Sequence, residues 1–111
     1  MNVSGSISST PGKEVILTQS TVVKRLSEYT RRRWSKGVVQ LNQYQRQLVI
    51  HILVEYHGFD PKQLTGLVGR SRSVVYSDLA SIEFYKKTKQ FTDDAQKLKD
   101  YILNPSDFVF Y

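Results

Sequence analysis

Apolar side chains recur at the three- and four-residue spacing of amphipathic helices along most of the chain after residue 13. The widest apolar stripe falls in residues 42–56, at positions Leu48, Val49, Ile52, Leu53 and Tyr56. A stripe this broad is typical of the central helix of a small bundle. A narrower stripe predicts an earlier helix over residues 21–33, with apolar positions Val22, Val23, Leu26 and Tyr29. The pattern leaves open whether residues 14–17 extend that helix or form a separate turn.

Residues 58–79 hold the most informative local pattern, which is two short helical stripes on either side of a glycine. Asp60 is a good N-cap, and Pro61 fits the first helical position, where its missing N–H costs nothing. The apolar face of the first helix consists of Leu64, Leu67 and Val68. Gly69 can adopt the positive φ that ends a helix. The order of elements predicts a helix-turn-helix, although an ordinary helical hairpin uses the same turn chemistry.

The second helix of this pair is predicted to extend to about residue 87. Ser71 or Ser73 can supply its N-cap, and its apolar stripe consists of Val75, Leu79 and Ile82. A last helix is predicted over residues 92–103, with Thr92 as its start and two aspartates in its first turn. Its apolar line is Phe91, Ala95, Leu98 and Ile102, and Asn104 followed by Pro105 ends it.

These elements predict an all-α fold, a bundle of four to five helices that contains a helix-turn-helix. Residues 1–13 are rich in Ser, Thr, Gly and Pro and predict a flexible N-terminal arm. Residues 14–103 form the predicted helical domain, and residues 104–111 form an apolar C-terminal tail. The tail is too apolar for a solvated segment, so it either packs on the domain or contacts another chain.

The charge of the chain favours a polyanionic partner. Sixteen Lys and Arg residues against ten Asp and Glu residues give a formal net charge of +6. The basic residues cluster between Lys24 and Lys36, where Glu28 is the only acid. The chain has no cysteine, no apolar run long enough to span a bilayer and no signal-peptide pattern at its start. These features favour a cytoplasmic protein without a membrane partner.

The residues that usually carry catalysis or bind metals are not arranged for either task. His51 and His57 lie six residues apart, off the spacing of a helical metal pair. Gly66 and Gly69 lack the Gly-Lys-Ser/Thr that completes a phosphate-binding loop. The carboxylates of Asp93 and Asp94 diverge on a helix, which favours capping over catalysis. We therefore expect no enzyme activity, no cofactor, no metal and no small-molecule substrate.

Three runs of residues resemble the DNA-binding C-terminal domain of the bacterial replication initiator DnaA, a member of the TrpR-like superfamily. They are Arg46-Gln47-Leu48, the segment 63–69 and the segment 70–75. Residues 35–36 lie at the distance expected for the start of that family's basic loop, so the resemblance covers roughly residues 15–103. It implies double-stranded DNA as the partner.

The resemblance also implies which residues contact DNA. The base-contacting positions would be Arg70, Ser71, Arg72, Ser73 and Val74. The phosphate-contacting positions would be Lys36, Arg46, Gln47, Pro61, Lys62, Ser77 and Ser81, with Arg31, Arg32 and Arg33 as a nonspecific basic cluster. Two alternatives stand beside these roles: Arg46 could pair with Glu55 or Glu28, and Arg70 with Asp60 or Asp78.

The chain departs from the family pattern at its base-reading positions. Ser71 and Arg72 stand where the family has Asp-His, Val74 replaces a threonine, and Val38 replaces the arginine that enters the minor groove. If the chain reads DNA, we expect a different target sequence, with Arg72 able to pair with guanine.

The sequence therefore predicts a sequence-directed duplex DNA-binding protein without an ATPase, which would serve in replication or transcription control. A bacterial or phage-encoded, nucleoid-associated protein fits this prediction. The alternative is a protein-interaction module that kept the fold, lost specific DNA binding and uses the C-terminal tail for a protein partner or self-association. A third possibility is nonspecific nucleic-acid or RNA binding through Arg31 to Arg33.

Overall fold

A computed structural model describes residues 17–110, which form five α-helices and two short 3₁₀ helices. The α-helices are α1 (Gln19–Trp34), α2 (Gln43–His57), α3 (Pro61–Val68), α4 (Arg72–Tyr85) and α5 (Lys89–Leu103). The 3₁₀ helices are η1 (Val38–Gln40) and η2 (Pro105–Asp107). No strand occurs in this part of the chain, so the predicted all-α class is confirmed. The predicted N-terminal arm, residues 1–13, lies outside the described residues.

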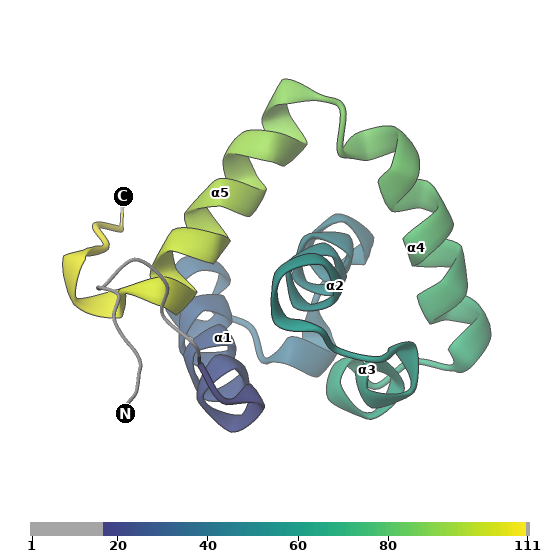
Figure 1. Ribbon diagram of the computed structural model, residues 1–111, viewed down its shortest axis with the longest axis horizontal. Helices are drawn as coiled ribbons and strands as arrows, with labels where there is room; N and C mark the ends of the chain where they lie inside the picture. Colours follow the sequence, from purple (N-terminus) through teal and green to yellow (C-terminus); the bar gives the residue numbers. More distant parts are fainter. Residues whose placement is uncertain (1–16, 111) are drawn as a thin grey trace, which may run out of the picture.

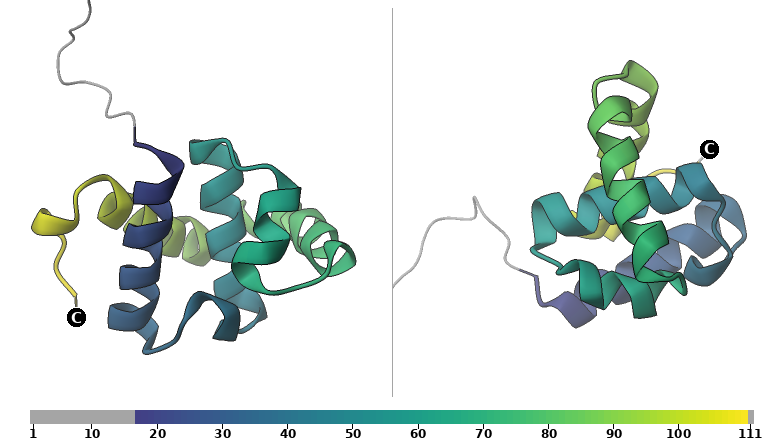
Figure 2. Two further views of the ribbon diagram at one scale, coloured as in Figure 1. Left: turned by 90° about the horizontal axis from the view of Figure 1, so that it is seen from below. Right: turned by 90° about the vertical axis from the view of Figure 1, so that its right-hand side faces the viewer.

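Helix α2 is the centre of the bundle (Figure 1). It packs against α4 on one side and α5 on the other, and α1 and α3 complete the surroundings. Six of its residues are buried: Gln47, Leu48, Val49, Ile50, Ile52 and Leu53. Because neighbours surround α2, its sequence carries the broad apolar stripe instead of a narrow one. The end of α4 and the start of α5 project beyond the other helices (Figure 2, right).

Local capping explains where most helices begin. The side chain of Asn42 accepts a hydrogen bond from the backbone N–H of Gln45 at 2.8 Å, and Oε1 of Gln45 accepts one from the backbone N–H of Asn42 at 3.2 Å. This reciprocal arrangement is a capping box, and each such cap contributes about 1 kcal/mol. Thr18 caps α1 in a simpler way. These starts lie within two residues of the predicted ones.

The start of α5 differs from the prediction. Thr88, and not Thr92, is the N-cap, and its side chain accepts a hydrogen bond from the N–H of Phe91 at 3.3 Å. The two aspartates therefore lie beyond the first turn. Asp93 pairs with Lys89 at 2.9 Å, and Asp94 accepts a hydrogen bond from the hydroxyl of Tyr44 at 2.6 Å. Helix α4 correspondingly ends at residue 85 instead of about residue 87.

The C-terminal tail packs on its own domain. The rings of Phe108 and Phe110 lie 5.8 Å from the buried ring of Tyr29 and 5.5 Å from that of Tyr101. The guanidinium of Arg32 lies 4.4 Å from the centre of the Phe110 ring, within the range of a cation–π contact. Of the two alternatives for the tail, the structure has the packed one.

Candidate nucleic-acid interface

Helices α3 and α4 are joined by the tight turn that the sequence predicted. Helix α3 begins after Asp60 and ends at Gly69, which has φ 66° and ψ 36°. The N–H groups of Gly69 and Arg70 both point back to the carbonyl of Thr65. Ser71 is the N-cap of α4, and its hydroxyl accepts a hydrogen bond from the N–H of Val74 at 3.4 Å. The predicted helix–turn–helix arrangement is therefore present.

Helix α4 has a buried face and an exposed face on opposite sides. Its buried residues are Val75, Asp78 and Ile82. The exposed side begins at the turn and carries Arg70, Ser71, Arg72, Ser73, Tyr76 and Ser77. Four of the five predicted base-contacting residues thus share one exposed surface, whereas Val74 is half-buried beside it.

Tyr76 belongs to this surface; the sequence left open whether it faces a DNA groove or solvent, and it was not among the predicted base contacts. Its side chain is 50% exposed, and it lies one turn after Arg72 and Ser73. The sequence spacing indicated this position, because Tyr76 is four residues from Arg72 and three from Ser73, and residues at these separations share a helix face.

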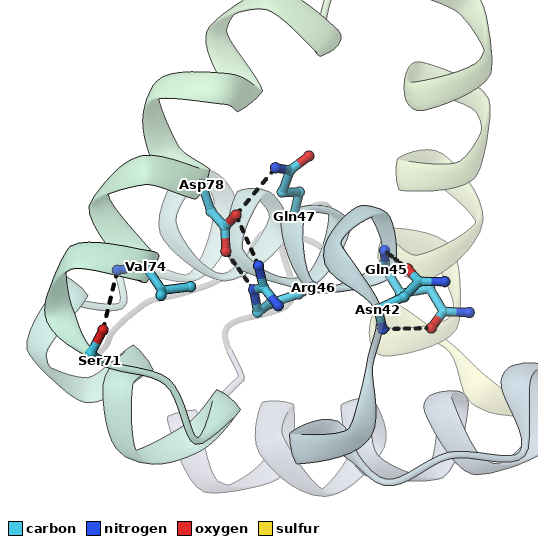
Figure 3. A network of polar contacts seen from close by, with 7 residues as sticks. All are labelled: Asn42, Gln45, Arg46, Gln47, Ser71, Val74 and Asp78. Carbon is cyan, nitrogen blue, oxygen red and sulfur yellow. Dashed lines mark hydrogen bonds and ion pairs between the residues drawn. The ribbon is translucent and has the colours of Figure 1, made fainter.

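A buried polar network ties α4 to the central helix (Figure 3). Nε and Nη2 of Arg46 donate to the carboxylate of Asp78 at 2.5 and 3.2 Å, and the amide of Gln47 donates to the same carboxylate at 3.2 Å. The side chain of Arg46 is 11% exposed, that of Asp78 is 2% exposed, and Gln47 is 1% exposed. Gln47 and Arg46 are thus held by the carboxylate of Asp78, which leaves little of either side chain exposed for the predicted phosphate contact.

The ion pairs of the structure answer which acids Arg46 and Arg70 pair with. Arg46 does form an ion pair, but with Asp78 and with neither Glu55 nor Glu28. Arg70 is exposed and forms no ion pair with Asp60 or Asp78.

The segment that precedes α2 lies beside the helix-turn-helix. η1 packs against α3, and a Cβ placed on Gly69 would lie 3.1 Å from Cγ1 of Val39. The segment contributes little charge, since Lys36 is half-buried and its Nζ lies 3.4 Å from Oε1 of Gln45. The segment therefore lies next to the turn between α3 and α4, with an apolar and not a basic tip.

The start of α3 offers one free cation and few free backbone donors. Lys62 is exposed, but its backbone N–H already donates to the carboxylate of Asp60 at 2.8 Å. That carboxylate occupies the place that a phosphate would take at a helix N-terminus. The backbone N–H of Lys62 is therefore already used, and its ammonium is the group left for a phosphate. Pro61 and Ser81 are half-buried, and Ser77 is exposed.

The three arginines of the basic cluster at the end of α1 differ in their exposure and contacts. Arg31 is exposed, Arg32 covers the ring of Phe110, and Arg33 is half-buried. Burial raises the pKa of the neighbouring Tyr29, and the positive charge of Arg33 partly opposes that rise. The cluster at the end of α1 also complements the negative end of the helix dipole.

Residues 17–110 contain no group of three or more His, Cys, Asp or Glu side chains placed to hold a metal ion. Within the same residues, no helix has the length and apolar character required to cross a bilayer. His51 and His57 are half-buried, and burial lowers the pKa of each imidazole.

No protein-family model matches the chain, and the curated proteins and the solved structures likewise yield no match. The resemblance to the initiator domain thus stays a prediction from the residues that carry it.

Proposed function

We propose that this protein binds double-stranded DNA, with the start of α4 in the major groove. The observation that carries the proposal is the exposed surface of Arg70, Arg72, Ser73 and Ser77, on the side of α4 opposite its buried residues. These side chains offer donors along one helix edge, which is how a recognition helix meets base edges. A major groove about 12 Å wide accepts one helix with its side chains.

Arg72 is the residue that we expect to read sequence. It is exposed in the first turn of α4, and its guanidinium can form two hydrogen bonds to guanine. Lys62 at the start of α3 is the best-placed exposed cation for the adjacent phosphates. The formal net charge of +6 favours binding to the negatively charged phosphate backbone of DNA.

We further propose a role in replication or transcription control, in the cytoplasm of a bacterium or on its nucleoid. This part of the proposal rests on the resemblance to the initiator domain. The chain would act as a DNA-binding unit.

One observation favours the alternative of a protein-interaction module. Two large aromatic side chains of α4, Tyr76 and Phe84, are 50% and 78% exposed. The tail is a poorer candidate for such a contact than the sequence suggested, because Phe108 and Phe110 pack on Tyr29 and Tyr101. A protein contact would therefore use α4.

Selection from a pool of random duplexes tests the proposal directly. The wild-type chain should enrich a short common motif, and Arg72→Ala should enrich a more relaxed one. Lys24→Ala removes an exposed cation from α1, away from α4, and serves as the matched control. A pool that stays random with the wild-type chain would reject sequence-directed binding.

A further inference from the structure

Helix α4 carries an exposed stripe that begins on the surface proposed for DNA and continues beyond it toward the end of the helix. The stripe lies opposite the buried Val75 and Ile82 and consists of Ser73, Tyr76, Ala80 and Phe84. All four side chains are exposed, and in Figure 2 (right) no helix of residues 17–110 lies in front of α4. Phe84 is the most exposed of the large apolar side chains of residues 17–110, at 78%. It lies 12 residues beyond Arg72, about 18 Å along the helix from the N-terminal turn that would contact bases.

The charged and small residues on this stripe are arranged in a self-complementary way. Arg72 and Glu83 are 11 residues apart, which is about 20° past three full turns, so both lie on one flank of the stripe. Ala80 is near the centre line and four residues from Tyr76. Arg72 forms no ion pair in residues 17–110, and Glu83 is 68% exposed although it lies 3.1 Å from Lys86.

We infer that the exposed stripe of α4 binds a second copy of this chain, with the two α4 helices antiparallel. In one common register Arg72 lies beside Glu83 of the second copy, and Tyr76 covers the small side chain of Ala80 of the second copy. The same register places Phe84 over Ser73 of the second copy, on the other flank. Each contact occurs twice because the pair has two-fold symmetry. Antiparallel packing also places the opposite ends of the two helix dipoles together.

The association is weak and reversible. A single helix pair buries less than the about 1,200 Å² that stable complexes bury. The formal net charge of +6 on each copy adds repulsion. Charge pairing and the covered aromatic rings determine the register, while the small contact area limits the affinity.

The surface for the second copy overlaps the surface proposed for DNA. Arg72 and Tyr76 belong to both, so a bound duplex and the helix pair exclude each other. This consequence rests on the proposed function, whereas the self-association itself does not.

Sedimentation equilibrium without DNA tests the self-association. At protein concentrations up to about 1 mM, the average mass of the wild-type chain should rise from 12.8 kDa toward twice that value. Arg72→Glu and Glu83→Arg should each weaken the association about tenfold or more, because like charges then face each other. An equimolar mixture of the two variants should associate again, since both inter-copy pairs become attractive. Val109→Ser alters an equally exposed apolar residue away from α4 and should change nothing.

Two results would overturn the inference: a wild-type chain that stays monomeric throughout, or two single variants whose mixture associates no better than either alone. Helical content measured by circular dichroism confirms that each variant is folded. DNA binding is measured separately, at protein concentrations where the chain is monomeric. A chain that pairs but does not bind duplexes would reject the proposed function and keep the inference.

Discussion

The guanidinium of Arg46 on α2 forms a two-point ion pair with the buried carboxylate of Asp78 on α4. Asp78 lies six residues after Arg72 on the same helix, about 120° around the helix axis from it. The pair therefore fixes how α4 is rotated against the central helix, and with it the direction in which the exposed face points. The amide of Gln47 donates a third hydrogen bond to the same carboxylate.

Breaking this pair should be costly. Arg46→Ala leaves the buried Asp78 carboxylate with one donor, and we expect the free energy of unfolding to fall by about 3–5 kcal/mol. Replacing both partners with apolar residues, Arg46→Met with Asp78→Leu, should cost less than Arg46→Ala alone. Urea unfolding measures the wild-type chain and both variants. Equal losses for the single and the double replacement would show that the pair is not the source of the stability.

The glycine at the turn should tolerate no side chain. Gly69→Ala adds a left-handed backbone cost of about 1–2 kcal/mol to the 3.1 Å contact with Val39. Gly58 has nearly the same φ, at 68°, but open space around its Cβ position, so Gly58→Ala measures the backbone cost alone. Gly66→Ala, inside α3 with open space, should stabilise the protein by up to about 1 kcal/mol.

Thermal unfolding of these three variants separates the cost of the left-handed backbone from the cost of the contact with Val39. Adding Val39→Ala to Gly69→Ala should recover the difference between the Gly69 and Gly58 variants and no more. If Gly69→Ala were no worse than Gly58→Ala, the close packing of η1 on the turn would have no energetic effect.

Two cationic side chains should affect DNA binding in different ways. Arg72→Ala should lower discrimination at one base position by about 1–3 kcal/mol. Lys62→Ala should weaken all duplexes alike and reduce the slope of log affinity against log salt by about one. Titrations of a selected and a scrambled duplex at several salt concentrations measure both effects. A Lys62 variant with an unchanged salt slope would remove this residue from the phosphate contacts.

Stability should fall on mild acidification. Burial lowers the pKa of His51, with Glu55 opposing and Lys86 adding to the shift, and burial and then Lys99 lower that of His57. The unfolded chain therefore binds more protons than the native one below about pH 6.5, and the free energy of unfolding drops as the pH falls through that range. Above about pH 7 the full stability is retained.

Urea unfolding at about pH 7.5 and about pH 5.5 measures this dependence. The chain with His51→Gln and His57→Gln reports what the carboxylates contribute over the same range. An identical drop in both chains would show that the histidines do not cause it.

The packed tail should contribute to stability. Phe110→Ala removes a half-buried ring from Tyr29, Tyr101 and the guanidinium of Arg32, and we expect a loss of about 1–2 kcal/mol. Val109→Ser, at the exposed position beside it, should change little. Thermal unfolding measures both variants. Equal effects of the two changes would contradict the packing of the ring.

The sequence by itself determined the features that depend on neighbouring residues. Apolar spacing predicted the number and order of the helices, and the caps at Asp60 and Ser71 and the turn at Gly69 followed from backbone chemistry. The same local pattern placed Arg70 to Ser73 together on an exposed helix start. These predictions succeeded because the groups that interact are within about four residues of each other.

Only the tertiary structure decided which polar residues face inward. Arg and Gln are residue types that usually lie on the surface. The burial of Arg46 and Gln47 depends on the carboxylate of Asp78, which is 32 and 31 positions away in sequence, respectively. The start of α5 and the position of the tail depend likewise on where Phe91, Phe108 and Phe110 reach buried apolar neighbours. A polar side chain becomes interior when a distant partner satisfies it, and spacing along the chain carries no information about that partner.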